Sequence, residues 1–207
     1  IMNFSPVGNK LLQDAVEQLS SLPGIGKESA LRFALYLLKQ PVENVERFGN
    51  SIVSMRREIK YCTECNMISD GPKCSVCADQ RRDHRTICVV ESLRDVLSIE
   101  ATGEYRGVYH ILGGVISPMD GIGPADLPID ALCRRVEGAR VDEVILALST
   151  GMEGETTSFY LYKVLSPMNV KITTIARGVA FGDDLEYTDQ LTLGKSIANR
   201  QIFSPEI

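Results

Sequence analysis

The chain has 207 residues, of which 44% are hydrophobic, and a formal net charge of −5 at pH 7. This composition is typical of a globular chain with room for one medium-sized domain and a smaller one. No apolar run approaches the ~20 residues of a membrane-spanning helix, and no signal peptide opens the sequence, so we expect a cytoplasmic protein. The negative charge also argues against a surface that binds nucleic acid everywhere.

The first third of the chain is predicted to be helical. Apolar side chains recur at helical spacing over residues 9–20, 28–38 and 43–60. Lysine and arginine slightly outnumber acidic residues up to residue 85, whereas acidic residues predominate after it. The cationic end of the third helix could extend a DNA path or simply complement the helix dipole. If the protein contacts DNA, this part is the expected contact region.

The first two helices are joined by the hairpin sequence Leu-Pro-Gly-Ile-Gly-Lys, which ends at Lys27. Gly24 and Gly26 allow backbone N–H groups to approach a phosphate, and the next helix presents its N-terminus to the same anion. We therefore expect both glycines to bind the DNA backbone, together with the nearest cations, Lys27 and Arg32. An ordinary turn between two packed helices is the alternative.

Four of the six cysteines form two Cys-x-x-Cys pairs separated by a short loop, namely Cys62, Cys65, Cys74 and Cys77. This spacing is typical of a site for one tetrahedral zinc ion, and four sulfur ligands leave no position open for water. We expect one structural Zn²⁺ per chain, with disulfides or free thiols as the alternative. Thiols of this kind fit a reducing cytoplasm.

From residue 86 onward, apolar runs of strand length alternate with amphipathic helical segments. Strands are expected at residues 86–90, 109–112, 144–148 and 171–176, and helices up to about residue 101, at 129–137 and at 156–165. The alternation predicts an α/β domain whose mostly parallel sheet is covered on both faces. Functional groups gather at the carboxyl ends of the strands in such sheets.

Acidic residues follow two of these strands. Glu91 ends the first strand, and Glu153 and Glu155 are expected in the loop after the third. Carboxylates at this edge could hold Mg²⁺ for phosphoryl chemistry. The segment resembles the Toprim domain of topoisomerases and primases, but Ser149 and Gly151 stand where its paired aspartates belong. We therefore expect at most weak Mg²⁺ binding and no two-metal catalysis.

The order of these parts resembles the bacterial recombination mediator family RecR over essentially the whole chain. Further matching motifs are Val89-Val-Glu-Ser92, Asp120-Gly-Ile-Gly-Pro124, Glu153-Gly-Glu155, Ala176-Arg-Gly178, Asp184-Leu-Glu186 and Thr192-Leu-Gly194. The resemblance implies a multi-domain fold of α+β and α/β parts. Its expected domains are a helical helix-hairpin-helix domain at 1–60, a four-cysteine zinc finger at 61–82, a Toprim domain at 83–176 and a C-terminal oligomerisation segment at 177–207.

The resemblance implies a non-catalytic, DNA-binding protein of recombinational repair. The family forms ring-like homotetramers able to encircle DNA, and it acts with RecO and RecF to help load RecA on gapped DNA. We therefore expect binding to single-stranded, double-stranded or gapped DNA in the nucleoid of a bacterial cytoplasm. Glu91, Glu153 and Glu155 are then expected to form a partner-binding face for RecO or a vestigial metal site.

Two positions depart from the family pattern. Pro-Lys often follows the second hairpin glycine, but here the pair is Lys27-Glu28, so an acid stands where a cation is expected. Arg32 matches the family's helix arginine and therefore carries more weight than Lys27. The tail reads Val179-Ala-Phe-Gly-Asp183 in place of a Pro-Val-Gly-Gly-like stretch, which argues against nucleotide binding there.

Two other functions remain open at the level of sequence. The first is a metal-dependent Toprim enzyme that acts on nucleic acid through Glu91 with Glu153 or Glu155, which the missing aspartate pair opposes. The second is a zinc-dependent interaction protein that never touches DNA, which the net charge favours and the hairpin opposes. Neither His84 nor His110 has a context that suggests catalysis.

Overall fold

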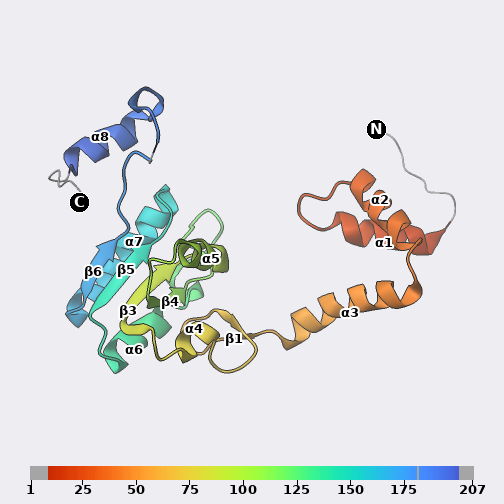
Figure 1. Cartoon of the computed structure of the whole chain (residues 1–207), viewed down its shortest axis with the longest axis horizontal. Coiled ribbons are helices and arrows are strands. Elements are labelled where there is room, and N and C mark those ends of the chain that lie inside the picture. The colour runs from red at the N-terminus through yellow and green to blue at the C-terminus, as the bar shows by residue number, and fades with distance from the viewer. Residues whose placement is uncertain (1–8, 181, 201–207) are drawn as a thin grey trace. The chain divides into compact units, whose positions relative to one another are not determined.

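The computed structural model describes residues 9–180 and 182–200 (Figure 1). The chain divides into two compact units, residues 1–59 and 60–207, and each is described by itself. Three parts of the sequence-based predictions lie outside the described residues. These are residues 1–8 of the helical domain, Phe181 of the tail motif and residues 201–207 of the C-terminal segment.

The first unit consists of three helices, α1 (Lys10–Ser20), α2 (Lys27–Leu37) and α3 (Val42–Glu58). Each begins and ends within two residues of its predicted limits. Helix α1 begins after Asn9, whose Oδ1 accepts hydrogen bonds from the N–H groups of Leu11 and Leu12 at 3.0 and 3.3 Å. Among the described residues of this unit, only Ala30 and Ala34 are buried, so each of its larger apolar side chains is partly or fully exposed.

The second unit contains a four-cysteine segment (residues 60–78) followed by an α/β domain and a C-terminal extension. Its elements in chain order are β1 (Lys60–Tyr61), β2 (Ile68–Ser69), α4 (Ser75–Ala78), β3 (Asp83–Val90), α5 (Leu93–Thr102), β4 (Gly107–Ile111), η1 (Pro124–Asp126), α6 (Ile129–Gly138), β5 (Glu143–Ala147), α7 (Met152–Leu165), η2 (Ser166–Met168), β6 (Lys171–Thr174), η3 (Leu185–Tyr187) and α8 (Gln190–Ala198). In the described residues, no helix is long and apolar enough to cross a membrane.

Four parallel strands form the main sheet in the order β4-β3-β5-β6. In the register of the two central strands, Val89 lies opposite Leu146, and Val89 faces His110 on the other side. The strands are parallel because a crossover segment between successive strands carries the chain back to the end of the sheet at which the strands begin. This confirms the predicted parallel α/β fold.

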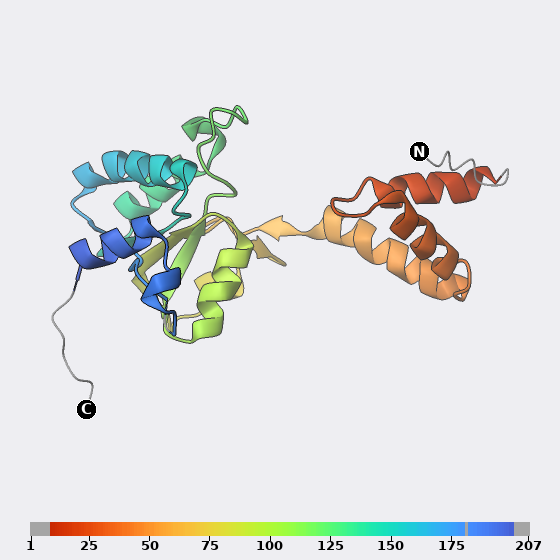
Figure 2. The ribbon, with the colours of Figure 1, turned by 90° about the horizontal axis from the view of Figure 1, so that it is seen from above.

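The two faces of the sheet are covered by different layers. Along β3, Ile87 and Val89 point into a core formed with α6 and α7. The alternate residues Cys88 and Val90 point the other way, into a core formed with α5 and with the cysteines of the four-cysteine segment. Figure 2 shows α5 and α7 on opposite sides of the sheet. The four-cysteine segment is therefore part of a cover layer of the sheet.

Several predicted limits are wrong; strand β3, for example, begins at Asp83, three residues before its predicted start. Helix α7 begins at Met152 and not at residue 156, so Glu153 and Glu155 lie in its first turn and not in a loop. The physical reason is that Gly151 takes the extended N-cap conformation and carboxylates are favourable at the positive end of a helix. Strand β6 ends at Thr174, two residues before its predicted end, where its pairing with β5 also ends, at Leu146.

Candidate zinc centre, hairpin and acidic edge

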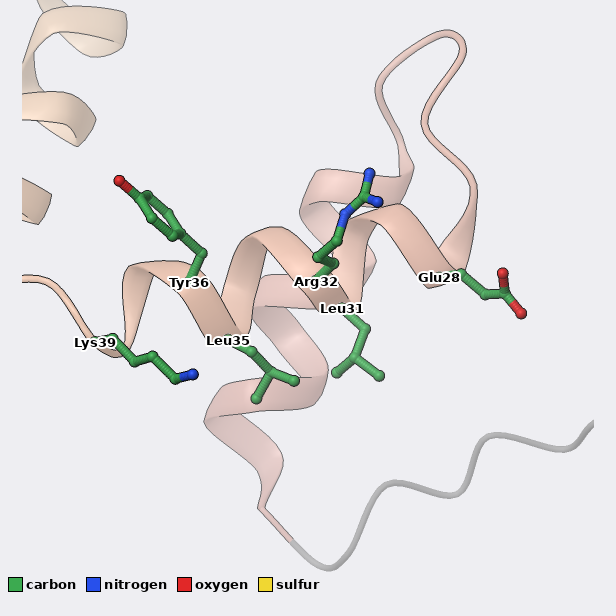
Figure 3. A pocket seen from close by; sticks show the side chains of 6 residues that line it. All are labelled: Glu28, Leu31, Arg32, Leu35, Tyr36 and Lys39. Atoms are coloured by element: carbon green, nitrogen blue, oxygen red, sulfur yellow. The ribbon is translucent and has the colours of Figure 1, made fainter.

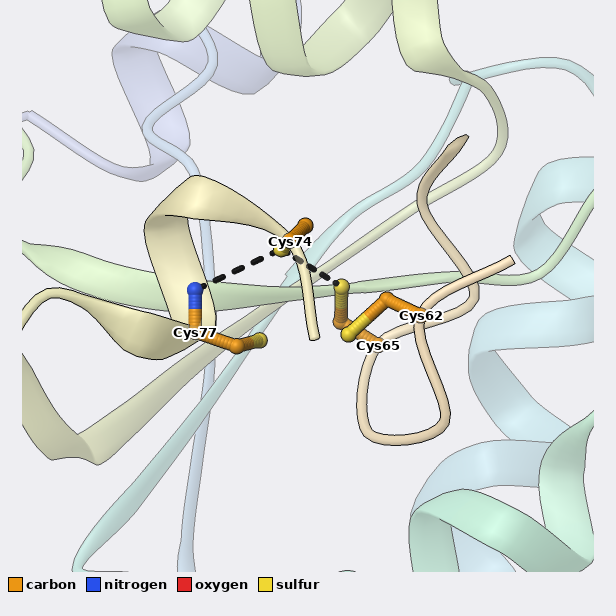
Figure 4. A group of neighbouring side chains, drawn as sticks. All are labelled: Cys62, Cys65, Cys74 and Cys77. Atoms are coloured by element: carbon orange, nitrogen blue, oxygen red, sulfur yellow. Dashed lines mark hydrogen bonds between the residues drawn. The ribbon is translucent and has the colours of Figure 1, made fainter. Parts of the chain in front are cut away.

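The four cysteines that were predicted to bind zinc come together (Figure 4). All are buried, and their Sγ atoms lie within 4.8 Å of one another, with Cys65 Sγ 3.5 Å from Cys74 Sγ. Four sulfurs around one zinc ion with Zn–S bonds of about 2.3 Å lie roughly 3.8 Å apart. No disulfide joins any of the six cysteines. The arrangement fits a closed, structural zinc site with four thiolate ligands.

Local backbone geometry brings the two cysteine pairs together. Asn66 takes a left-handed conformation with φ of 62°, which turns the chain back so that the N–H of Cys62 donates to the carbonyl of Met67 at 2.7 Å. In the second pair, Cys74 precedes α4, and its Sγ accepts a hydrogen bond from the N–H of Cys77 at 3.3 Å. Such N–H···S bonds stabilise thiolates.

The thiols require a cation before all of them can ionise. Burial opposes ionisation of Cys62, but backbone hydrogen bonds outweigh it and lower its pKa to about 7. Burial raises the pKa of Cys74 to about 11. The pKa of Cys77 is raised further, first by its hydrogen bond with Cys65 and then by burial. A zinc ion supplies the positive charge that such a buried cluster of thiolates needs.

The four-cysteine segment is fastened to the edge strand β4. The N–H of Ile111 donates to the carbonyl of Cys65 at 2.8 Å, and the side-chain amide of Asn66 donates to the carbonyl of Ile111 at 3.1 Å. From α6, the guanidinium of Arg135 donates to the carbonyls of Tyr109 and Glu64 at 2.7 and 3.4 Å. The four-cysteine segment thus provides hydrogen-bond partners for backbone groups of β4, the strand at the edge of the sheet.

The predicted DNA-binding hairpin leaves the N-terminus of α2 open. Gly24 has a φ of 81°, which favours glycine, and the N–H of Ile25 closes the turn onto the carbonyl of Leu22 at 3.1 Å. Gly26 is the N-cap residue of α2 and provides no side-chain cap, so the first N–H groups of the helix lack that partner. A Cβ at Gly26 would meet nothing within 4 Å, which leaves room for a ligand.

Both predicted cations of the hairpin region are exposed on α2. Lys27 is the first residue of the helix, and Arg32 lies more than one turn further on, with its guanidinium carbon 5.7 Å from the ring centroid of Phe33. A hollow of about 540 Å³ on this helix is lined by Glu28, Leu31, Arg32, Leu35, Tyr36 and Lys39. Figure 3 shows Arg32 and Tyr36 on one side of α2 and the two leucines on the other.

The three predicted acidic residues do not form one cluster. Among the described residues, the zinc cysteines are the only group of three or more potential ligands whose donor atoms all lie within 4.8 Å. Glu91 follows β3, and its Oε1 accepts a hydrogen bond from the N–H of Ser149 at 2.6 Å. Glu155 pairs with Arg177, with Oε1 and Nη1 2.5 Å apart, and Glu153 is exposed. The geometry does not match a site that clamps a divalent ion between several carboxylates.

The loop before α7 is held in place by Gly154 and Thr157. A Cβ at Gly154 would collide with the backbone and side chain of Ser149. The buried hydroxyl of Thr157 donates to the carbonyl of Glu153 at 2.7 Å and accepts from the N–H of Ile116 at 2.9 Å. These contacts fix the start of α7 against the loops that follow β4 and β5.

Sequence reasoning did not assign a role to Arg177 or Arg135. Arg177 was noted only as part of a family motif, although its position just after the fourth strand is where charged groups reach the edge of the sheet. Arg135 has no such signal, because its contacts with Tyr109 and Glu64 depend on how α6 packs.

Comparison with known proteins gives matches along most of the chain. Residues 12–56 match the family described as RecR, helix-hairpin-helix, and residues 59–79 match the RecR zinc finger domain with four cysteine ligands. Residues 85–176 match the Toprim domain, and residues 178–201 match RecR, C-terminal. The matched families confirm the predicted sequence of parts.

Full-length relatives agree with these matches. The chain is 55% identical over 199 residues to recombination protein RecR of Porphyromonas gingivalis W83, covering 96% of each chain. It is 56% identical over 194 residues to the same protein of Bacteroides thetaiotaomicron, covering 94% of this chain and 95% of the relative. For Flavobacterium johnsoniae the identity is 50% over 202 residues, covering 98% and 97%. A closed four-cysteine zinc site, an open hairpin and a Toprim sheet, together with these identities over nearly the full length, show that the chain belongs to the RecR family of recombination proteins.

Proposed function

We propose that this chain is a non-catalytic, DNA-binding recombination mediator in DNA repair. The relatives with half or more of their residues identical are named recombination protein RecR. The structural observation that carries DNA binding is the N-terminus of α2, where Gly26 provides no side-chain cap, with the exposed Arg32 more than one turn further along the helix. Helix N-termini of this kind bind phosphate through backbone N–H groups, without regard to base identity.

Replacement of Arg32 by alanine tests this interface. Because a hydrogen bond to a charged group is lost, affinity for labelled single-stranded, double-stranded and gapped DNA should fall about ten-fold at low salt. The slope of log affinity against log salt should also become shallower by about one unit per contact. Fluorescence anisotropy at several salt concentrations measures both quantities.

Arg140→Ala is the matched control, because it removes the same charge from an exposed position in the other unit. It should bind DNA like the parent chain. Equal affinities for the Arg32 and Arg140 variants at matched salt would contradict the hairpin interface. An absence of salt-dependent binding in the parent chain would instead favour an interaction protein that does not touch DNA.

The absence of catalysis is part of the proposal. Ser149 and Gly151 occupy the loop positions of the Toprim aspartates, and Glu91 and Glu155 already have partners within the chain. Gapped DNA incubated with the protein and Mg²⁺ or Mn²⁺ should be retarded on a native gel and intact on a denaturing gel. Cleaved or religated DNA that disappears with Glu91→Gln would make the chain an enzyme.

We further infer a homotetramer that acts with RecO and RecF at the nucleoid to load RecA. The support for assembly is apolar surface. A cavity of about 490 Å³ in the first unit is lined by Leu11, Leu38, Val42 and neighbouring side chains, and α8 has no buried residue. Both surfaces fit another copy of the chain, since apolar patches of this kind mark protein contacts. The exposed carboxylate of Glu153 and the half-buried carboxylate of Glu91 would serve as partner contacts for RecO.

A further inference from the structure

Three neighbouring strands of the sheet end at the same edge, and each delivers a different group there. Glu91 follows β3, the Ser149 loop follows β5 and Arg177 follows β6. In the sheet these strands stand in the order β3-β5-β6, and all three are parallel, so their carboxyl ends are adjacent. We call this carboxyl end of the sheet the acidic edge. It carries the carboxylate of Glu91, the polar loop that contains Ser149 and the guanidinium of Arg177.

Arg177 is held against the first turn of α7. Its Nη1 lies 2.5 Å from Oε1 of Glu155, and only 28% of its side chain is exposed. Its Nε is buried and has no hydrogen-bond partner among the described residues. The guanidinium is therefore largely enclosed beside the carboxylate.

The second carboxylate of the edge is also engaged. Oε1 of Glu91 accepts the N–H of Ser149 at 2.6 Å. A Toprim-type Mg²⁺ site does not fit these residues, because Ser149 and Gly151 supply no carboxylate and a metal ion would have to share Glu155 with a guanidinium. Two cations on one carboxylate repel each other.

We propose that Arg177 is the resident cation of the acidic edge. Its guanidinium balances the charge of Glu155 at the place where a divalent ion would otherwise bind, and it excludes such ions from the edge. The same contact ties the start of the C-terminal segment to α7. This inference concerns the Toprim sheet and stands whether or not the chain binds DNA.

Manganese binding to the zinc-loaded full chain tests the proposal, because free Mn²⁺ is measured directly by electron paramagnetic resonance. The parent chain should bind Mn²⁺ weakly. Arg177→Met removes the charge and keeps most of the apolar stem, and it should raise the Mn²⁺ association constant about five-fold, as expected from the loss of a competing, partly exposed ion pair. Arg177→Lys should bind Mn²⁺ as weakly as the parent, because the positive charge remains.

The gain must come from Glu155. Arg177→Met combined with Glu155→Gln should therefore bind Mn²⁺ no better than the parent chain. Arg85→Met is the matched control, since Arg85 also forms an ion pair, with Asp142, but lies at the start of the sheet strands. It should leave Mn²⁺ binding unchanged.

Arg177→Gln is neutral and polar, and it replaces Arg177→Met if that variant loses zinc or melts early. Zinc content and thermal melting identify correctly folded samples. The proposal is overturned if the folded neutral variants bind Mn²⁺ no more tightly than the parent chain, or if the gain persists after Glu155→Gln.

Discussion

His110 is a histidine that the folded chain keeps neutral. Its side chain is 1% exposed, and its Nε2 donates to the carbonyl of Pro128 at 3.0 Å, while Nδ1 is buried without a partner among the described residues. Burial lowers the pKa of His110 from 6.5 to about 4, and the nearby Arg135 acts in the same direction. No catalytic role was predicted for His110 from the sequence. In the structure it is a buried histidine with a structural role.

The lowered pKa predicts loss of stability in mild acid. Between the folded value of about 4 and the unfolded value of 6.5, the unfolded chain binds the proton more readily. This contribution is complete above pH 6.5 and is lost as the pH falls toward 4. The free energy of unfolding should therefore drop by about 2 kcal/mol between pH 7 and pH 5 through this residue.

Urea denaturation at both pH values checks this prediction against His110→Gln. Protonation of zinc thiolates weakens both proteins equally, so the difference between them isolates the imidazole. The variant should lose about 2 kcal/mol less than the parent chain over this pH range. Parallel pH profiles for the two proteins would contradict it.

At the scale of elements, the four-cysteine segment and the sheet share one core. Cys62, Cys65, Cys74 and Cys77 lie in the same apolar cluster as Cys88, Val90, Tyr109 and Ile111. The hydrogen bond from the N–H of Ile111 to Cys65 joins their backbones. Zinc therefore stabilises one whole face of the sheet in addition to the loop that binds it.

Loss of one zinc ligand should consequently destabilise the entire second unit. Cys77→Ser should bind less than one zinc per chain and melt at least about 10 °C below the parent chain, because several kcal/mol of metal binding are lost. Circular dichroism and elemental analysis measure the two effects. Cys133→Ser, at a half-buried cysteine outside the zinc site, should keep its zinc and melt close to the parent. A Cys77 variant with an unchanged melting temperature would argue against structural zinc.

The predicted elements were most accurate where residue pattern alone determines structure. Three of the four strands contain apolar runs, and all four were predicted to within three residues at each end, whereas α7 was predicted four residues short at its start. That start depends on Gly154 fitting against Ser149, a tertiary contact that leaves no periodic signal. The short elements β1, β2 and α4 were not predicted, because the zinc site and not an apolar repeat organises them. Helix α8 was also missed.

The parts of the candidate site that depend on residues close together in the sequence were predictable. Two Cys-x-x-Cys pairs specify their own geometry, and the hairpin specifies an open helix N-terminus. The acidic edge depends instead on how distant segments meet. Arg177 is separated from Glu155 by a helix and a strand, so its pairing could not be inferred from the sequence.

At the scale of the whole molecule, apolar surface is left uncovered at both ends of the chain. In the first unit Leu11 and Leu38 are 80% and 71% exposed. In the C-terminal extension, Leu185, Leu191 and Ile197 are also exposed. Exposed apolar patches of this kind mark protein contacts, so the two ends are consistent with the proposed assembly.

Removal of this apolar surface should reduce the oligomer. Leu11→Ser combined with Leu38→Ser should shift the molar mass measured by light scattering to a smaller species. Because both side chains are exposed, the stability of each unit should change little. Asp14→Ser, at another exposed position of α1, should leave the mass unchanged. A monomeric parent chain, or an unaltered mass in the double variant, would refute this contact.

The shared core of the zinc segment and the sheet constrains how the chain can be divided in expression work. A fragment that begins after the last zinc cysteine would expose the side of β3 that carries Cys88 and Val90, along with Tyr109 of β4. Such a truncation should precipitate, while one that starts at residue 60 should remain in solution. During synthesis, the four-cysteine segment emerges from the ribosome before β4, so its inner surface stays uncovered until about residue 111 has emerged.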